Sequence, residues 1–134
     1  MMNERGPEIT RILIVDDQEL VRFVMERALA KLEPRCHLES ASGGHEAIGM
    51  MEAERPDLLI TDIKMPGGGG VELTEHMRSQ GIDTTVVWMT AHGCEAYRED
   101  VERLSVYQCI EKPLEVNAIR EVVKKALEHR GSRG

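Results

Sequence analysis

Short apolar runs along this chain alternate with longer stretches in which apolar residues recur at every third or fourth position. The short runs predict β-strands, because they are too short for buried helices and the first of them, RILIV, is rich in β-branched residues. They span residues 11–15, 36–41, 57–61, 84–90 and 107–111. The longer stretches have the periodicity of amphipathic helices, and one follows each predicted strand.

The apolar positions of these helices define the faces that we expect to pack on a sheet. In the first helix they are Val21, Val24, Met25, Ala28, Leu29 and Leu32, and Pro34 ends the helix. In the last helix they are Val116, Ile119, Val122, Val123, Ala126 and Leu127. The helices between are expected at 43–54, at 71–80 and, after residue 90, around Tyr97, Val101 and Leu104.

Alternation of strands and helices predicts βαβ units, and therefore a parallel sheet with helices on both faces. Right-handed crossovers leave few topologies. We predict an α/β fold of the flavodoxin-like, doubly wound (βα)5 type, a three-layer sandwich around a parallel five-stranded sheet of order 2-1-3-4-5. The expected division is a flexible N-terminal segment at 1–10, one domain at 11–129, and a tail or the start of a linker at 130–134.

Length and charge narrow the class of protein. A chain of 134 residues is about one domain long, and 41% hydrophobic with 31% charged residues fits a globular domain. The net charge of −7 argues against a broad nucleic-acid-binding surface. The N-terminus lacks the apolar core of a signal peptide, and no apolar run approaches the ~20 residues that span a bilayer. We therefore expect a cytoplasmic protein without a membrane partner.

Three cysteines, Cys36, Cys94 and Cys109, are widely spaced and form no CxxC pair. Their spacing favours neither a disulfide framework nor a zinc site, and a reducing cytoplasm is the simplest setting. The neighbouring His92 and Cys94 suggest a metal site, but two ligands do not make one.

Polar side chains stand at the carboxyl ends of four of the five predicted strands. Asp16 and Asp17 follow the first strand, Asp62 the third, Thr90 the fourth and Lys112 the fifth. Each has a simpler explanation when taken alone: a helix cap, a turn residue or a surface lysine. Taken together they predict a ligand site, because the carboxyl ends of parallel strands meet at one edge of the sheet.

The three carboxylates call for a cation. Two carboxylates about 4 Å apart repel by ~4 kcal/mol at an effective dielectric of about 20. An all-oxygen site with few protein ligands suits Mg²⁺, with Mn²⁺ as a second candidate. The Lys112 ammonium and the Thr90 hydroxyl would complete a cradle for phosphoryl oxygens, and Asp62 would be the nucleophile.

The chain resembles the receiver domain of bacterial two-component response regulators. The matching motifs are ILIVDD (12–17), PDLLITDIKMPGGGG (56–70), VVWMTA (86–91) and EKPL (111–114). The resemblance implies a signalling domain rather than an enzyme. Its partners would be a sensor histidine kinase or a histidine phosphotransfer protein, and downstream an effector domain or protein, with a dimer formed on phosphorylation as a further possibility.

The resemblance also assigns roles to single residues. Asp62 would accept the phosphoryl group. Asp17 and Asp62 would bind Mg²⁺ directly, Asp16 largely through water, and the backbone carbonyl of Lys64 would complete the protein ligands. Thr90 would bind the phosphoryl group by a hydrogen bond.

Lys112 would pair with the phosphoryl group, and the bond from Lys112 to Pro113 would be cis. Phosphorylation would pull Thr90 inward and rearrange the face made by the fourth helix, the fifth strand and the fifth helix. Lys64 and His92, two residues past Asp62 and Thr90, would tune hydrolysis of the phosphoryl group.

Two features depart from the family pattern. Where the family often has an aromatic residue, three positions before the lysine, this chain has Cys109, and its tyrosine is Tyr107. Four consecutive glycines, 67–70, predict a permissive turn over Asp62; the alternative is a loop whose ordering couples to phosphorylation or to partner docking.

Competing functions stay open at this point. A small phosphatase would need a DxD arrangement after the first strand, which VDDQE lacks. A degenerate receiver would act only as a protein-docking module. The chain could equally be a stand-alone receiver or the N-terminal module of a longer regulator or hybrid kinase.

Overall fold

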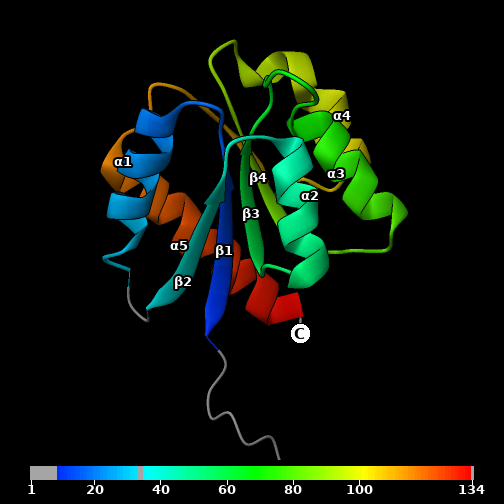
Figure 1. The fold of residues 1–134 in the computed structure, drawn as a ribbon. Coiled ribbons are helices and arrows are strands. Elements are labelled where there is room, and N and C mark those ends of the chain that lie inside the picture. Colours follow the sequence, from blue (N-terminus) through cyan, green and yellow to red (C-terminus); the bar gives the residue numbers. More distant parts are fainter. Residues whose placement is uncertain (1–8, 33–34, 134) are drawn as a thin grey trace, which may run out of the picture.

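All five predicted strands are present in the computed structural model, which describes residues 9–32 and 35–133. The strands are β1 (Thr10–Val15), β2 (Cys36–Ala41), β3 (Leu58–Asp62), β4 (Thr85–Thr90) and β5 (Gln108–Glu111). They form one parallel sheet in the order β2-β1-β3-β4-β5 (Figure 1). The predicted fold class and strand order are confirmed.

Helices cover both faces of this sheet. They are α1 (Glu19–Leu29), α2 (Gly44–Ala53), α3 (Gly70–Ser79), the short 3-10 helix η1 (Cys94–Tyr97), α4 (Arg98–Arg103) and α5 (Val116–Arg133). Helices α1 and α5 pack on one face, and α2, α3 and α4 lie on the other (Figure 1).

Successive side chains along the strands point to opposite faces of the sheet and belong to two separate cores. In β1, Leu13 and Val15 join the core under α2 and α3, whereas Ile12 and Ile14 join the core under α1 and α5. Every residue of β3 and β4 is buried, as expected for central parallel strands covered on both faces. Trp88 in β4 is fully buried in the first core.

The predicted apolar stripes are correct in most positions and wrong in two. Val24 of α1 is 36% exposed and Val116 of α5 is 39% exposed, because both lie at the margin of the face that meets the sheet. Leu20 and Phe23 are exposed beside Val24. Pro34, expected to end the first helix, lies outside the described residues.

Two boundaries differ from those predicted. Helix α5 continues to Arg133, past the expected end of the domain at residue 129. The fourth helical segment begins with a 3-10 turn before its single α-helical stretch. The expected flexible segment at 1–10 lies outside the described residues except for residues 9 and 10, and Thr10 already belongs to β1.

No helix within the described ranges combines the length and the apolar character that crossing a membrane requires.

The interpretation of the cysteines is wrong for two of them. Cys94 and Cys109 form a disulfide, although they are 15 positions apart in sequence. The register explains it: Cys109 of β5 pairs with Trp88 of β4, and the chain that leaves β4 turns back over β5, which brings Cys94 to the same place. Spacing along the sequence carries no sign of this proximity.

Candidate functional site

The acidic residues gather where β1 and β3 end side by side. Val15 pairs with Thr61 in the parallel register, so the residues that follow, Asp16 and Asp62, leave the sheet as neighbours. Asp16, Asp17 and Asp62 each offer an oxygen, and these oxygens lie within 4.8 Å of one another. Asp16 and Asp62 are buried and Asp17 is exposed, so the cluster has one open side.

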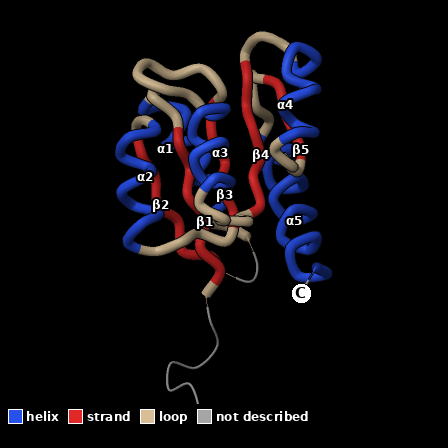
Figure 2. Tube along the Cα trace, turned by 90° about the vertical axis from the view of Figure 1, so that its right-hand side faces the viewer, coloured by secondary structure: helices blue, strands red, loops and turns tan. Residues whose placement is uncertain are grey.

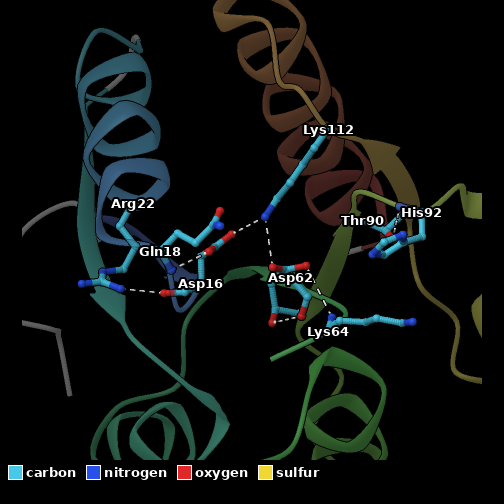
Figure 3. Close-up of polar contacts among 9 residues, drawn as sticks. Asp16, Gln18, Arg22, Asp62, Lys64, Thr90, His92 and Lys112 are labelled. Atoms are coloured by element: carbon cyan, nitrogen blue, oxygen red, sulfur yellow. Dashed lines mark hydrogen bonds and ion pairs between the residues drawn. The ribbon is translucent and has the colours of Figure 1, made fainter. Parts of the chain in front are cut away.

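Lys112 joins the two buried carboxylates. Its side chain extends from the end of β5 between them, with Nζ 2.9 Å from Oδ2 of Asp16 and 3.0 Å from Oδ2 of Asp62 (Figure 3). The Lys112 side chain is only 15% exposed. The peptide bond from Lys112 to Pro113 is cis, in agreement with the expectation.

Asp16 is held in place by two residues that the sequence analysis did not single out. The backbone N–H of Gln18 donates to Oδ1 of Asp16 at 2.9 Å. The Arg22 guanidinium donates to the backbone carbonyl of Asp16 at 2.7 Å (Figure 3). An aspartate two residues before a backbone donor is a common turn and could have indicated the first contact, whereas no sequence signal marks Arg22.

Charge in this cluster is unbalanced. Three carboxylates against one ammonium leave an excess of two negative charges. Burial raises the pKa of Asp62 above its usual value, and the nearby Asp16 adds to the rise, while the contacts with Lys112 oppose it. Burial by itself would lower the pKa of Lys112, but its two carboxylate partners outweigh burial and raise it.

The donor set fits a hard divalent cation. All three side chains offer oxygen, the ligand that Mg²⁺ prefers. Neither oxygen of Asp17 is hydrogen-bonded to another described residue, so its exposed carboxylate is available to a metal. The three oxygens lie within 4.8 Å of one another, close enough for a single Mg²⁺, which keeps several waters, to be held by them directly or through water.

Thr90 ends β4 next to this cluster. In the register Asp62 pairs with Met89, the residue before Thr90. The Thr90 side chain is buried, and its hydroxyl accepts a hydrogen bond from the backbone N–H of His92 at 3.0 Å (Figure 3). The hydroxyl is therefore satisfied within its own loop.

The side chains of Lys64 and His92 lie outside the buried part of the site. The backbone N–H of Lys64 lies 3.4 Å from Oδ1 of Asp62, and its side chain points away from Lys112 (Figure 3). Both side chains are exposed. Within the described part of the chain, no group of three metal-binding side chains includes His92 or Cys94, and the only such group is the aspartate cluster.

The glycine-rich turn over Asp62, at 67–70, is less free than the sequence predicts. A Cβ on Gly69 would overlap the backbone carbonyl of Ile63, so only glycine fits there. The Gly69 N–H donates to the Glu72 carboxylate at 3.0 Å, which caps α3. Gly67 and Gly68 do adopt positive φ with open space around them, so freedom is confined to these two.

The region expected to carry the signal contains η1, α4 and β5. Tyr97 is partly buried and its ring meets that of Trp88 edge-on, with centroids 6.4 Å apart. Tyr107 is also partly buried and lies against His129 of α5, with ring centroids 5.0 Å apart. Cys109, at the position where an aromatic residue is usual, is instead bonded to Cys94.

Sequence comparisons agree with this geometry. The family model of the response regulator receiver domain matches residues 12–124. The sporulation initiation phosphotransferase F of Bacillus subtilis (strain 168) is 33% identical over 127 residues, covering 95% of this chain and 96% of that protein. The positive alginate biosynthesis regulatory protein of Pseudomonas aeruginosa is 31% identical over 116 residues, covering 86% of this chain and 46% of that protein.

The chain thus spans nearly all of one relative and under half of the other. A DNA-binding transcriptional regulator of Salmonella typhimurium, NtrC, is 28% identical over 118 residues, and there the match covers 25% of the relative. Relatives of this family therefore occur both at the length of this chain and as much longer proteins.

Solved structures show the same fold. The CheY-like response regulator receiver domain protein of Methanospirillum hungatei superposes with a TM-score of 0.83 at 25% identity, covering 95% of this chain and 100% of that one. The signal receiver domain of a LuxO-type repressor protein from Vibrio parahaemolyticus gives 0.87 at 21% identity, covering 94% and 95%. With a family model matched along most of its length, the chain belongs to the response regulator receiver domains, the signalling domains of two-component systems.

Proposed function

We propose that this domain accepts a phosphoryl group on Asp62 from a phosphohistidine, in a Mg²⁺-dependent reaction. The observation that carries the proposal is Lys112, whose ammonium contacts both Asp16 and Asp62 within a cluster that still has two excess negative charges. Such a centre is suited to binding a divalent cation together with the anionic oxygens of a phosphoryl group.

Each residue has a defined part in the transfer. A carboxylate oxygen of Asp62 attacks phosphorus, the bond from phosphorus to the histidine nitrogen breaks, and the imidazole leaves with its electron pair. Asp17, Asp62 and the carbonyl of Lys64 would hold Mg²⁺ directly and Asp16 through water. When bound, Mg²⁺ supplies positive charge that neutralises the carboxylates and the phosphoryl oxygens.

Two side chains respond to the new phosphoryl group. The Lys112 ammonium exchanges part of its contact with Asp62 for a phosphoryl oxygen. In the structure, the Thr90 hydroxyl accepts a hydrogen bond from the backbone N–H of His92 at 3.0 Å. The hydroxyl gives up this hydrogen bond and donates to another phosphoryl oxygen. The loop after β4 then shifts, and the face formed by α4, β5 and α5 changes shape for a partner.

The proposed partners follow from this chemistry. A sensor histidine kinase or a histidine phosphotransfer protein would supply the phosphoryl group, in a cytoplasmic pathway. The receiver unit at 11–129 would pass the signal to an effector domain or protein, or to a second phosphorylated copy. The alternative is a degenerate receiver that only docks partners.

Mass spectrometry with acetyl phosphate tests the proposal. The intact wild-type protein should gain one phosphoryl group in the presence of Mg²⁺ and none in EDTA. Asp62→Asn should gain none while keeping its circular dichroism spectrum. A folded wild-type protein that neither gains a phosphoryl group nor binds Mg²⁺ in a titration would instead support the docking module.

A further inference from the structure

The Cys94–Cys109 disulfide encloses most of the chain between β4 and β5. It joins the first residue of η1 to the second residue of β5, with Cα atoms 5.8 Å apart. The closed loop contains the rest of η1, all of α4 and the turn before β5, which lie together at one edge of the molecule (Figure 2). We name residues 91–107 the β4–β5 connection.

Besides the disulfide, the enclosed segment is held mainly near its end, where Leu104 and Val106 join the core and the Arg78 guanidinium donates to the carbonyls of Leu104 and Ser105. Neither η1, with four residues, nor α4, with six, contains a buried residue. Their ion pairs, Arg98 with Glu95 and Arg103 with Asp100 and Glu75, are largely exposed, and exposed pairs add little stability. Segments with so little buried surface open locally at low free-energy cost, so a crosslink has a large effect on them.

The disulfide is also close to the phosphoryl-binding loop. Only residues 91–93 separate Thr90 from Cys94. At one end of this stretch the His92 N–H donates to the Thr90 hydroxyl at 3.0 Å. At the other end the Cys94 N–H donates to the Glu111 carboxylate of β5 at 3.0 Å. The disulfide therefore restrains any movement of this loop, because it ties the end of the loop to β5.

We propose that Cys94 and Cys109 form a reversible thiol–disulfide site that sets the mobility of the β4–β5 connection. Both residues are only partly buried, and Cys94 lies in η1, outside the sheet, so the bond is near the surface, where thiol–disulfide exchange can take place. In the oxidised state the connection is tied to β5, and in the reduced state it opens more readily.

Low-molecular-weight disulfides, such as glutathione disulfide, are the oxidants for this site. One protein thiolate attacks the reagent, which releases one thiol and leaves a mixed disulfide. The second protein thiolate attacks that mixed disulfide, which releases a second thiol and forms the bond between Cys94 and Cys109. The two protein thiols lose two electrons and two protons, and the reagent disulfide gains both. Excess thiol reverses the exchange.

The third cysteine provides a matched control. Cys36 begins β2, the strand at the opposite edge of the sheet, and takes no part in the disulfide. Burial raises the pKa of its thiol, and the nearby Asp57 adds to the rise, so Cys36 is disfavoured as an attacking thiolate. Cys36→Ser should leave the exchange at Cys94 and Cys109 unchanged.

Hydrogen exchange on the unphosphorylated protein tests the proposal directly. Glutathione disulfide should convert the reduced protein to a form lighter by two hydrogen atoms, with Cys94 and Cys109 linked in a peptide map. Amides of the β4–β5 connection should then exchange about tenfold more slowly, and those of β1 and β3 should change less. Cys94→Ser and Cys109→Ser should behave as the reduced protein under both conditions, and Cys36→Ser as the wild type.

Two results would overturn the proposal: no bond formed by glutathione disulfide in the folded protein, or an equal slowing of exchange in β1, β3 and the connection. The second would mean that the disulfide only stabilises the whole fold. If Cys109→Ser does not fold, Cys94→Ala is the substitute variant, because its side chain lies in η1, outside the sheet.

A second readout rests on the proposed phosphorylation. The oxidised protein should accept a phosphoryl group from acetyl phosphate about threefold or more slowly than the reduced protein, because the tied loop opposes the shift of Thr90. Equal rates would overturn this coupling to the redox state. Absence of phosphorylation in both states would overturn the proposed function instead, and the exchange result would stand.

Discussion

The aspartate cluster and the β4–β5 connection lie next to each other but are held by different forces. In the cluster, buried charged groups from three strand ends contact one another across the sheet, with Lys112 bridging Asp16 and Asp62. In the connection, the two short helices contain no buried residue, and the segment is held by one disulfide, by the contacts of Arg78 and by Leu104 and Val106 at its end.

This difference matches what each region is expected to do. Phosphoryl transfer requires groups that keep their positions, and the ends of central parallel strands provide them. Signalling requires a segment that adopts two conformations of similar free energy, and a segment with few buried contacts provides that. The chemistry can therefore follow the family pattern closely while the signalling region departs from it, as Cys109 does.

Removal of the Lys112 ammonium should have the largest effect. We expect Lys112→Ala to lower the rate of phosphorylation by acetyl phosphate about 100-fold, because one positive group that faces the developing charge is lost. Intact-mass kinetics in Mg²⁺ would measure it. The exposed lysine of α5, in Lys124→Ala, is the control and should keep the wild-type rate; equal rates for both variants would contradict the role of Lys112.

Loss of Arg78 would test how far the connection depends on a polar anchor. Its guanidinium donates from α3 to four backbone carbonyls, those of Ile82, Thr84, Leu104 and Ser105. Arg78→Ala should lower the free energy of unfolding by about 2–3 kcal/mol, since partly buried carbonyls lose a charged donor. Urea denaturation would measure it.

Arg103→Ala is the matched control for Arg78→Ala. Among the described residues, Arg103 pairs with Glu75 and Asp100 at the surface, so its loss should leave the unfolding free energy nearly unchanged. A large loss of stability in Arg103→Ala would show that surface ion pairs hold the connection as firmly as the Arg78 contacts do.

Metal binding at the aspartate cluster should raise the stability of the fold. At Mg²⁺ tenfold above its dissociation constant, the unfolding free energy should rise by about 1.4 kcal/mol. Asp17→Asn should lose most of this gain, whereas Glu19→Gln, a neighbouring exposed acid in α1, should keep it. Thermal unfolding with and without EDTA would separate the two variants.

The raised pKa of Asp62 predicts that ionisation of this carboxyl group lowers the stability of the fold. Because the folded state disfavours the ionised carboxyl, its contribution to stability is present below the unfolded pKa and is lost as pH rises through the folded pKa. At neutral pH in EDTA, Asp62→Asn should therefore be more stable than the wild type. A lower melting temperature for Asp62→Asn would mean that its contact with Lys112 outweighs burial.

The smallest expected effect concerns the exposed side chains beside the site. Lys64→Ala and His92→Ala should each speed loss of the phosphoryl group about threefold, equivalent to about 0.7 kcal/mol, because a smaller side chain leaves more room for water. Decay of the phosphorylated protein after removal of acetyl phosphate would measure it. Unchanged decay in both variants would rule out this role.

Most of the fold was predictable because its signals are local. Strands such as 57–61 are short apolar runs, and the helices between them have clear periodicity, so the topology followed from few rules. The errors concern margins, such as the exposed Val24 and Val116, where neighbouring elements decide whether a side chain is covered. The turn at 67–70 was also predicted incorrectly at Gly69, because only the close approach of Gly69 to Ile63 shows that the turn is tight there.

The sequence by itself determined the sheet order and the meeting of Asp16, Asp17, Asp62, Thr90 and Lys112, because residues that end parallel strands must share one edge. Only the tertiary structure decided that Lys112 bridges two of these acids and that Cys94 is bonded to Cys109. Both contacts depend on the paths of side chains and loops between distant segments, and no spacing along the chain encodes them.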